Sequence, residues 1–299
     1  MKITEVKKQK KRYLPLLLLA DEQEDMIDKY INRGRMFILD DGGIKASMVV
    51  TREGRDVLEI KNLAVASAYQ KQGYGRIMID FILDKFAGEY TVLQAGTGDS
   101  PVTIGFYEKC GFKRTHKIKN FFLDNYDKPI FDGGVQLTDM IYLRKAFPLR
   151  IMKIWEFQDM IRNAAGWFSG KWNIPQKAYM ESMKSYEEGN ISSPRWYVVL
   201  NSHGDIIAGA GVIDNDFHER TDLSPNICAL FVEKEYRNIG IAANLLDFIR
   251  KDLGRIGCEK VYLVTDHREF YEKCGCEFFG MVRDSDGNSV RMYIADTLK

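Results

Sequence analysis

The chain has 299 residues, of which 45% are hydrophobic and 28% are charged, and its formal net charge is +1. This composition is typical of a globular protein long enough for two domains, and the balanced charge gives no field that favours nucleic acid or an anionic membrane. No segment has the roughly 20 consecutive apolar residues of a membrane-spanning helix, so we expect neither nucleic acid nor membrane as a partner.

The N-terminal stretch from Lys7 to Ala20 imitates a secretory signal peptide, because basic residues precede a leucine-rich run. That run contains Pro15, continues into an amphipathic segment at 21–35, and has no small-residue cleavage site after it. The five cysteines form no Cys-x-x-Cys pair and no cysteine–histidine cluster with zinc spacing. We therefore expect a cytoplasmic protein with buried free thiols and no metal.

In chain order, the first half predicts a mixed succession of strands and helices. Apolar alternation or short apolar runs predict strands, a helical apolar period predicts helices, and Asp/Gly-rich turns predict hairpins. The expected elements are a strand at 2–7, a helix at 14–33 in one or two pieces, strands at 36–39 and 46–51, a strand ending at 65, a helix ending at 86, a strand at 90–94, a helix at 101–109, and strands at 117–123 and 137–145.

The second half repeats this succession with two longer helical segments at its start. The expected elements are helices at 155–172 and 175–188, strands at 196–200 and 206–213, a strand ending at 232, a helix ending at 251, a strand at 261–264, a helix at 269–273, and strands at 278–283 and 289–294.

The stretch from 58 to 86 holds the clearest motif. An apolar strand is followed by Gln70-Lys71-Gln72-Gly73-Tyr74-Gly75, and an amphipathic helix begins there. Two glycines at a helix start let the main chain turn tightly, and the exposed N–H groups with the helix dipole predict a phosphate or pyrophosphate site. Met78 replaces the third glycine of a dinucleotide fingerprint, and the chain has no Gly-Lys-Ser/Thr run of a P-loop.

The same pattern recurs in the second half as Arg237-Asn238-Ile239-Gly240-Ile241-Ala242. Each loop is followed by a short apolar strand and then by the pentapeptide Tyr-Glu-Lys-Cys-Gly, at 107–111 and at 271–275. Because both features recur in the same order at nearly the same separation, the chain contains an internal repeat of about half its length. We expect two domains, at residues 1–147 and 148–299.

The pattern Arg/Gln-x-x-Gly-x-Gly/Ala between a strand and a helix resembles the acetyl-CoA pyrophosphate loop of the GNAT acyltransferase superfamily. The resemblance covers almost all of both halves and implies two tandem α/β domains with mixed sheets. It further implies an N-acetyltransferase that moves an acetyl group from acetyl-CoA to a primary amine of a small molecule or peptide by direct attack in a ternary complex. The alternative is an acyl-CoA-binding sensor or structural module in which one domain, more readily the second, is not catalytic.

The resemblance implies that the main chain of each loop holds the pyrophosphate and that the preceding strand pairs with the pantetheine arm. The residues expected at these positions are Leu63, Ala64, Val65, Gln70, Lys71, Gln72, Gly73, Tyr74 and Gly75 in the first domain and Leu230, Phe231, Val232, Arg237, Asn238, Ile239, Gly240, Ile241 and Ala242 in the second. Arg237 offers a charge-assisted contact that Gln70 cannot make, which predicts tighter cofactor binding in the second domain.

In this family a tyrosine ahead of the Glu-Lys-x-Gly segment often protonates the leaving thiolate, and Tyr107 and Tyr271 match that position. Packing beside the pantetheine arm is the other explanation for these tyrosines. A carboxylate on the strand before the loop often takes the amine proton, and Glu59 holds that place. An ion pair with Lys61 explains Glu59 equally well. The aligned residue of the second domain is Asn226, and an amide cannot act as a base, so the first domain has the more complete site.

For the second domain, the polar groups that could replace this base are Asp214, Asp216 and His218, although an ordinary polar loop explains them better. Substrate specificity is expected from the N-terminal helices and hairpin loops of each domain. The acidic residues there in the first domain are Asp21, Glu22 and Glu24, which a solvated helix face explains better. The aromatic residues in the second are Trp167, Trp172, Tyr179 and Trp196, for which packing is the default explanation. The acceptor, the acyl chain and the oligomeric state stay open.

Overall fold

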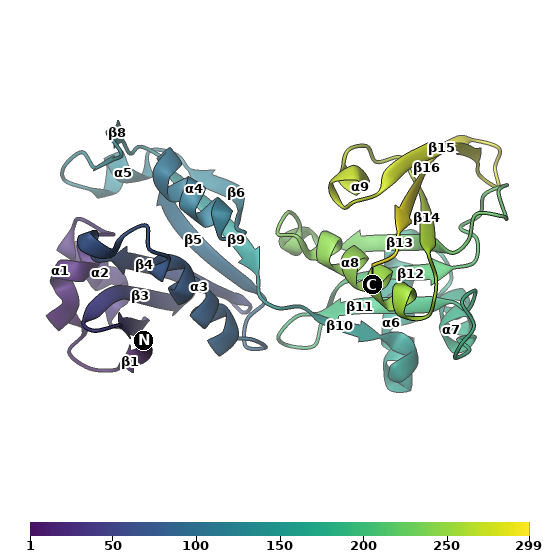
Figure 1. The fold of residues 1–299 in the computed structure, drawn as a ribbon, viewed down its shortest axis with the longest axis horizontal. Helices are drawn as coiled ribbons and strands as arrows, with labels where there is room; N and C mark the ends of the chain where they lie inside the picture. The colour runs from purple at the N-terminus through teal and green to yellow at the C-terminus, as the bar shows by residue number, and fades with distance from the viewer. Residues whose placement is uncertain (299) are drawn as a thin grey trace. The chain divides into compact units, whose positions relative to one another are not determined.

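The structure is a computed structural model that describes residues 1–298 (Figure 1). The chain divides into two compact units, Met1–Pro148 and Leu149–Lys299. Each unit contains one seven-stranded sheet of mixed direction, with helices packed on it. The α/β fold class with two mixed sheets, predicted from the sequence, is confirmed. In the described residues, no helix has both the length and the apolar character needed to span a bilayer.

The sheet of the first unit has the order β1-β2-β3-β4-β5-β9-β6. β4 and β5 are parallel, and all other neighbours are antiparallel. A separate pair, β7 and β8, lies outside it. The elements are β1 Lys2–Val6, α1 Leu14–Leu17, α2 Glu24–Ile31, β2 Arg35–Asp40, β3 Ile44–Arg52, β4 Val57–Val65, α3 Tyr74–Lys85, β5 Val92–Gly98, α4 Pro101–Lys109, β6 Lys113–Ile118, α5 Phe121–Asn125, β7 Phe131–Asp132, β8 Val135–Gln136 and β9 Met140–Ala146.

The apolar residues of β2 explain why this sheet carries helices on both faces. Phe37 and Leu39 belong to a core cluster that includes residues of α3 and α4. Met36 and Ile38 belong to a second cluster with residues of α1 and α2. Because successive side chains of a strand point to opposite faces, one continuous apolar strand supplies both cores.

The sheet of the second unit has the matching order β10-β11-β12-β13-β14-β16-β15, with β13 and β14 parallel. Trp196 and Val198 of β11 pack with α6 and α7, whereas the ring of Tyr197 lies 6.0 Å from Phe248 on α8. The elements are β10 Arg150–Lys153, α6 Ile161–Trp172, α7 Gln176–Lys184, β11 Arg195–Leu200, β12 Ile206–Ile213, β13 Asn226–Val232, α8 Ile241–Arg255, β14 Lys260–Thr265, α9 Phe270–Lys273, β15 Glu277–Arg283 and β16 Ser289–Asp296.

One predicted strand is wrong. The sequence predicts a strand at 117–123, but the strand is β6, which ends at Ile118, and the next residues form the short helix α5. Asn120 separates the two elements, because its φ of 56° is left-handed and its N–H donates to a carboxylate oxygen of Asp139 at 3.0 Å. Such a residue ends an extended strand, whatever the apolar pattern that follows it.

The helix predicted at 155–172 is shorter than expected. Two 3₁₀ turns occupy 154–156 and 158–160, and α6 begins only at Ile161, because Phe157 between the turns has a φ of −136° and is not helical. The strand β10, just before these turns, has no counterpart in the sequence prediction. The other predicted elements are present, with ends that differ by a few residues, as in β5, which lies somewhat later than predicted.

The two units differ in two connections. In the first unit, the connection from β6 to β9 covers 119–139 and contains α5, β7 and β8, whereas β15 and β16 are joined by a turn at 284–288. Between β3 and β4 of the first unit, by contrast, the connection is short and covers 53–56. The equivalent connection of the second unit, between β12 and β13, is long and covers 214–225. Each unit therefore carries its long connection at a different place.

The pentapeptide Tyr-Glu-Lys-Cys-Gly ends a helix in the same way in both units. In the first unit, the N–H of Gly111 bonds the Glu108 carbonyl at 2.9 Å, and the N–H of Phe112 bonds the Tyr107 carbonyl at 3.1 Å. The aligned bonds of the second unit are Gly275 to Glu272 at 3.1 Å and Cys276 to Tyr271 at 3.0 Å. These bonds form a Schellman motif, in which the glycine is left-handed.

A cationic side chain completes each of these helix ends. Lys145 Nζ donates to the carbonyl of Cys110 at 2.7 Å, and Arg250 Nη1 donates to the carbonyl of Cys274 at 3.1 Å. A cation at the C-terminus of a helix stabilises the negative end of its dipole. The repeated pentapeptide therefore fixes the tyrosine, three residues before the cap, in the same place in both units.

Gly111→Ala should lower the free energy of unfolding by about 1 kcal/mol, because an L-residue is strained in the left-handed region. The cost comes from the φ of 89°, since an added Cβ would meet only Lys145 Cε at an ordinary 3.5 Å. Urea unfolding measures the change. Gly105→Ala is the control, because its Cβ would meet open space within α4 and should leave stability equal or higher. If Gly111→Ala and Gly105→Ala changed the free energy of unfolding equally, the left-handed φ of Gly111 would not be the cause.

Candidate active site

The parallel strands of the first unit, β4 and β5, pair over only part of their length. The ladder between β4 and β5 ends at Ile60 and Ala95, although β4 continues to Val65 and β5 to Gly98. On its other side β4 carries a bulge, because Val50 pairs with Ile60 but Val49 pairs with Asn62. The end of β4 is thereby turned away from β5, and its main chain on that side is available to pair with an extended ligand.

In the second unit, the separation comes even earlier. Within the described residues, the ladder between β13 and β14 contains only the pair Asn226–Tyr262, although β13 continues to Val232. The register with β12 shifts between Gly209 and Gly211, opposite Ala229, whose φ of 51° is left-handed. Both units thus place a bulge and an open strand edge just before the glycine loop.

The glycine loops have the same backbone shape. Lys71 and Gly73 have φ values of 62° and 94°, and the aligned Asn238 and Gly240 have φ values of 61° and 90°. The two glycines are the N-cap residues of α3 and α8, and no side chain of the described chain caps either helix start. The N–H groups of the first turn are therefore left for an anion, as the sequence predicts.

The first residue of each motif ties the loop to the strand before it. Gln70 Nε2 donates to the Val65 carbonyl at 3.3 Å, and Arg237 Nε donates to the Val232 carbonyl at 2.8 Å. The guanidinium of Arg237 also lies 5.2 Å from the centre of the Phe231 ring. The guanidinium of Arg237 thus already makes two contacts within the protein. Tighter cofactor binding through Arg237 stays a prediction.

Gly75 has a packing role that the sequence does not show. An added Cβ at Gly75 would lie 3.0 Å from the ring of Phe106 on α4, which is tighter than an ordinary contact. A side chain here would push α4 away from the start of α3. At Gly73, by contrast, the Cβ would meet nothing within 4 Å, and its left-handed φ is what favours glycine.

Glu59 lies in the middle of β4 with only 4% of its surface exposed. Its Oε1 accepts from Lys61 Nζ at 2.7 Å, and its Oε2 accepts from Gln94 Nε2 on β5 at 2.6 Å. Gln94 Oε1 accepts in turn from Arg144 Nε on β9 at 2.6 Å. The ion pair with Lys61 exists, but it is part of a buried network rather than an exposed strand surface. The role of Glu59 as a base stays a prediction.

Tyr107 lies on α4, between the rings of Phe106 and Phe112 at 5.2 and 5.3 Å. Burial raises the pKa of its hydroxyl, and the thiol of Cys110 and the carboxylate of Glu59 add to the rise. The hydroxyl therefore keeps its proton throughout the physiological range. The role of Tyr107 as an acid stays a prediction.

Asn226, which is aligned with Glu59, is completely buried and serves as a hydrogen-bond anchor. Its Nδ2 donates to the carbonyls of Asp214 and Leu223 at 2.9 and 2.7 Å. Its Oδ1 lies 2.9 Å from Nε2 of His218. These three bonds hold both ends of the connection between β12 and β13, so Asn226 shapes this loop and, as predicted for an amide, is no base.

Burial raises the pKa of three titratable groups in the second unit. Tyr271 on α9 and Tyr179 on α7 are both buried, and the pKa of each hydroxyl is raised by burial, with a smaller contribution from the carboxylate of Asp216. Burial in turn raises the pKa of Asp216 to about 6, and the imidazole of His218 offsets part of the rise. The roles of Asp216 and Tyr271 in catalysis stay predictions.

Asp21 of the first unit lies inside the domain rather than on a solvated helix face. Its carboxylate accepts from the hydroxyl of Tyr30 at 3.2 Å and from that of Tyr126 at 3.1 Å, and burial raises its pKa. Tyr126 belongs to the long connection between β6 and β9, which is thereby held against the segment between α1 and α2. Glu22 and Glu24 are exposed, and Glu24 pairs with Lys11 at 2.8 Å.

The aromatic residues of the second unit divide into two groups. Tyr179 and Trp196 are buried in the core with α6 and α7. The rings of Trp167 and Trp172 lie 5.8 and 6.4 Å from Phe231 on the open strand β13. The packing explanation therefore holds for the first group, and the second group lies beside the predicted cofactor strand.

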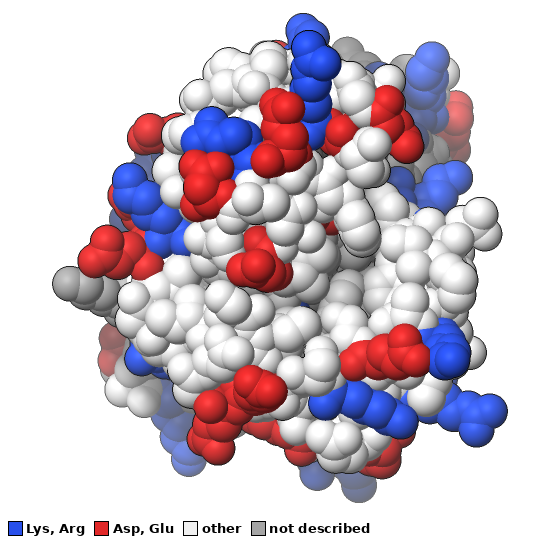
Figure 2. Space-filling view, turned by 90° about the vertical axis from the view of Figure 1, so that its right-hand side faces the viewer, with Lys and Arg blue, Asp and Glu red and all other residues white. Residues whose placement is uncertain are grey.

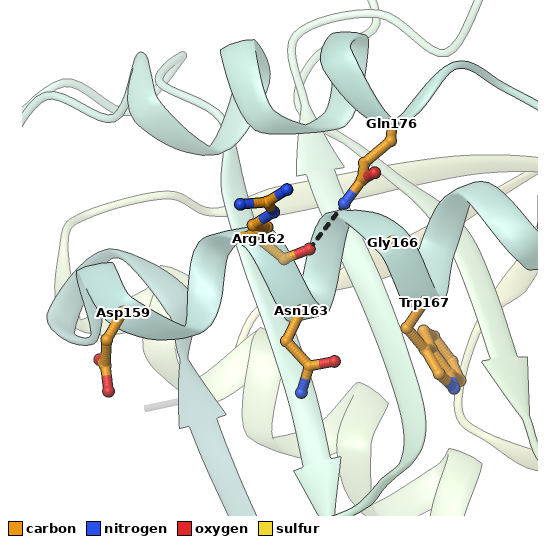
Figure 3. Close-up of a pocket in the computed structure, with 6 residues that line it drawn as sticks. All are labelled: Asp159, Arg162, Asn163, Gly166, Trp167 and Gln176. Atoms are coloured by element: carbon orange, nitrogen blue, oxygen red, sulfur yellow. Dashed lines mark hydrogen bonds between the residues drawn. The ribbon is translucent and has the colours of Figure 1, made fainter.

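A groove of about 640 Å³ runs along α6 and is lined by Asp159, Arg162, Asn163, Gly166, Trp167 and Gln176. Figure 3 shows Asp159, Asn163 and Trp167 on one side of the helix, at intervals of one turn, while the Gln176 amide reaches the Arg162 carbonyl. Trp167 connects the groove to Phe231, but none of the predicted catalytic residues lines it. We therefore place the candidate chemistry at the separated strands and not in this groove.

Charge is mixed on the face shown in Figure 2, where acidic and basic side chains surround a hollowed centre of mostly uncharged residues. No sign dominates there, in keeping with the net charge of +1. Long-range electrostatic attraction therefore contributes little to substrate selectivity, which has to come from short-range contacts.

Comparison with known proteins identifies the family. The profile described as "Acetyltransferase (GNAT) domain" matches residues 32–114 and 192–276, together more than half of the chain. The chain belongs to the GNAT acetyltransferase family. The two matched regions include the glycine-containing segments at 70–75 and at 237–242, one in each unit. The family identification made from the repeated motif is thereby confirmed.

Individual GNAT relatives match about half of the chain or less. The uncharacterized N-acetyltransferase YvbK of Bacillus subtilis is 36% identical over 132 residues, which cover 43% of this chain and 84% of YvbK. The [ribosomal protein bS18]-alanine N-acetyltransferase of Escherichia coli K12 is 27% identical over 97 residues, or 32% of this chain and 63% of that enzyme. A crystal structure of a GNAT acetyltransferase from Elizabethkingia anophelis with acetyl-CoA bound is 35% identical, with a TM-score of 0.46, over 48% of this chain and 95% of that one.

Sequence reasoning missed several polar partners in the first GNAT unit. Besides Gln94 and Arg144, these include Tyr142 on β9, whose ring stacks on His116 at 4.5 Å. Burial raises the pKa of Tyr142 to about 12, and the charges of Glu59 and Glu53 add to the rise. Polar residues at alternate positions of otherwise apolar strands, as in Glu59 and Lys61 of β4 or Tyr142 and Arg144 of β9, are the signal that could have revealed this network.

Lys61→Met should lower the free energy of unfolding by about 2 kcal/mol, because it leaves Glu59 buried without its cation. In a chain that also carries Glu59→Gln, the same substitution should cost much less, since no buried charge remains. Urea unfolding of the four chains of this double-mutant cycle measures the difference. Equal costs in both backgrounds would show that the ion pair does not stabilise the fold.

Proposed function

We propose that this chain transfers the acetyl group of acetyl-CoA to a primary amine of a small molecule or peptide, by direct attack in a ternary complex. The observation that carries the proposal is a separated parallel strand pair next to an uncapped helix start with two left-handed residues, found in both units. An extended amide-containing arm and a pyrophosphate are the two chemical groups that such a pair of features accommodates.

The donor would occupy equivalent places in the two domains. The main chain of 63–65 and of 230–232 would pair with the pantetheine amides, because these residues lie beyond the end of the parallel ladder. The N–H groups of 72–75 and of 239–242 would hold the pyrophosphate at the positive ends of α3 and α8. The Elizabethkingia anophelis relative, which is crystallised with acetyl-CoA, supports this choice of donor.

In the first domain, Glu59 would accept a proton from the acceptor's ammonium group, directly or through water. The neutral amine nitrogen then attacks the thioester carbonyl carbon, so that a C–N bond forms and the C–S bond breaks. Tyr107 donates its proton to the departing CoA thiolate, and the proton that the nitrogen loses on forming the amide restores the tyrosine. The buried, protonated state of Tyr107 supports this assignment.

The acceptor is a primary amine in this proposal, and a peptide amine is one of its forms. The Escherichia coli relative is named for an alanine of a ribosomal protein, which supports a peptide amine as acceptor. The mixed surface charge does not favour a strongly charged polymer.

The test of the proposed function is consumption of acetyl-CoA, followed by chromatography, with a panel of polyamines, amino acids, aminoglycosides and short peptides. We expect turnover with one amine class and, by calorimetry, two acetyl-CoA molecules bound per chain. Gly73→Asp should reduce this number to one, because a carboxylate at the helix start repels the pyrophosphate. Gly73→Asn is the matched control, because asparagine tolerates the left-handed conformation without adding charge. Two bound molecules without turnover of any amine would leave a binding protein.

Tyr107→Phe should lower kcat by about 100-fold, because the leaving thiolate loses its proton donor. The measurement requires a chain that also carries Gly240→Asp, so that the first domain alone binds the donor. Tyr90→Phe is the control, since this tyrosine lies in the same core, with its ring 5.8 Å from Phe86. An unchanged kcat in Tyr107→Phe would show that Tyr107 only packs beside the donor.

A further inference from the structure

We infer that the acceptor amine of the first domain also carries a carboxylate, and that Arg144 and Lys113, at one end of a polar row across the sheet, bind this carboxylate. The inference rests on the proposed function and deepens it, because it names the substrate class of one of the two domains. An amino acid is the simplest molecule of this class.

Four side chains from neighbouring strands form the polar row. The strands β4, β5, β9 and β6 are adjacent in the sheet (Figure 1). Their register sets Glu59 opposite Gln94, Gln94 opposite Arg144, and Arg144 opposite Lys113. The amide of Gln94 donates to Glu59 and accepts from Arg144 Nε, both at 2.6 Å. Because residues that stand opposite each other on paired strands point to the same face, the row crosses one face of the sheet.

The row lies on the face of the sheet that α3 and α4 do not cover. Leu93 and Leu143, the chain neighbours of Gln94 and Arg144, belong to the core with α3 and α4. Successive side chains of a strand point to opposite faces, so Gln94 and Arg144 point away from those helices. The core of α1 and α2 on the other face includes residues of β1, β2 and β3, but none of β5, β9 or β6. Arg144 is half-buried and Lys113 is exposed, so a ligand can reach both.

Arg144 and Lys113 are two cations that stand opposite each other without an anion. Glu59, the carboxylate of the row, pairs with Lys61 at 2.7 Å. Within residues 1–298, neither Arg144 nor Lys113 forms an ion pair. Like charges directly opposite on neighbouring strands destabilise a sheet. A carboxylate bound between the two cations would remove this repulsion.

The guanidinium of Arg144 has donors left for such a ligand. Its Nε bonds Gln94, and no residue of the described chain accepts a hydrogen bond from its Nη1 or Nη2. This end of a guanidinium can hold both oxygens of one carboxylate. Two residues away on β9, the ring of Tyr142 stacks on His116 at 4.5 Å, with the planes 7° apart. Burial, with the charge of Arg144 next, lowers the pKa of His116, so this stack is uncharged at neutral pH.

The row lies directly beside the point where β4 and β5 separate. The next pair of the ladder, Ile60–Ala95, is its last. The following residue of β5 is Gly96, where an added Cβ would lie 3.2 Å from the ring of Tyr142. The glycine thus leaves room for this ring at the end of the ladder. A carboxylate on Arg144 would therefore hold an acceptor beside the open strand edge that is proposed to bind the donor.

The length of the row limits the size of the acceptor. A single glutamine amide spans the distance between Glu59 and Arg144. Glu59 is the proposed proton acceptor for the amine, and Arg144 would hold the carboxylate. The two groups of the acceptor would thus be only a few bonds apart, as they are in an amino acid. Polyamines and aminoglycosides offer no anionic group to the two cations and should be rejected by like-charge repulsion.

The second domain lacks this pair of cations. Its matching register sets Asn226 opposite Tyr262, Tyr262 opposite Ile294, and Ile294 opposite Glu277. An apolar residue and a carboxylate thus replace the two cations. We therefore expect the preference for a carboxylate in the first domain alone.

The experiment uses the full chain with Gly240→Asp, so that the first domain alone binds acetyl-CoA. It compares amino acids with their carboxamides, which have the same amine but no carboxylate. For at least one amino acid, kcat/KM should exceed that of its carboxamide by about 30-fold, because a charge-assisted pair with Arg144 is lost in the carboxamide. Arg144→Gln should remove most of this ratio by lowering kcat/KM for the amino acid alone.

Two further variants separate recognition from packing. Lys113→Gln should lower the ratio by about threefold, because the cation that it removes is exposed. Arg114→Gln is the matched control and should leave the ratio unchanged, since Arg114 stands opposite Leu143 and pairs with Glu108 at 2.8 Å. Equal losses for the amino acid and the carboxamide in Arg144→Gln would show that Arg144 only supports the row, and would overturn the inference.

Stability measures the repulsion between the two cations without turnover. Lys113→Gln should raise Tm at low salt, because it removes one of two like charges, and the gain should shrink in concentrated NaCl. In a chain that also carries Arg144→Gln, Lys113→Gln should not raise Tm, since no repulsion remains. If Lys113→Gln left Tm unchanged or lowered it at low salt, the two cations would not repel each other and the inference would lose its basis.

The outcomes separate this inference from the proposed function. If the Gly240→Asp chain acetylates amines but does not prefer any amino acid over its carboxamide, the inference is wrong while the proposed function stands. The same holds if the unmodified chain is active and the Gly240→Asp chain is not, because the first domain is then not catalytic. No turnover of any amine by the unmodified chain would overturn both.

Discussion

In each domain, the ladder between the two parallel strands ends early, and this leaves a strand edge that is open to a ligand. Adjacent parallel strands normally satisfy each other's main-chain groups along their whole length. Here β4 and β5 stop pairing at Ile60 and Ala95, and a bulge opposite Val49 and Val50 turns the end of β4. The strand edge left open needs a partner with alternating donors and acceptors, and the helix that follows begins with N–H groups that need an anion. One local departure from regular pairing thus sets up both halves of the donor site, and the second domain repeats it.

The two domains are alike where the donor would lie and different where an acceptor would lie. The loop backbone, the tie from the first motif residue to the strand and the helix stop after the tyrosine are all repeated. The first domain then covers its N-terminal helices with the connection at 119–139, held through Tyr126 and Asp21. The second has only a turn there and carries a long loop between β12 and β13 instead. This division is expected if both domains use one donor and each selects its own acceptor.

Features that are local in the chain could be predicted from the sequence, and features that depend on distant partners could not. The glycine loops and the repeated pentapeptide need only neighbouring residues, and both have the expected conformation. The helix α5 was predicted as a strand because its two phenylalanines fit an apolar run, whereas the left-handed Asn120 depends on Asp139, far along the chain. The burial of Glu59 depends on Gln94 and Arg144, which come from two other strands.

The helix stop at the pentapeptide has a consequence for how such a duplicated chain can change. Its hydrogen bond uses the carbonyl oxygen of Tyr107 or Tyr271, whereas the proposed chemistry uses the hydroxyl of the same residue. The architecture and the reaction are thus encoded in different atoms of one amino acid. A copy of the domain could exchange this tyrosine for phenylalanine and keep its helix end, its core and its donor loop. Under the proposed mechanism, catalytic activity could therefore disappear from one copy without leaving a trace in the fold, and the hydroxyl itself would distinguish an active copy from an inactive one.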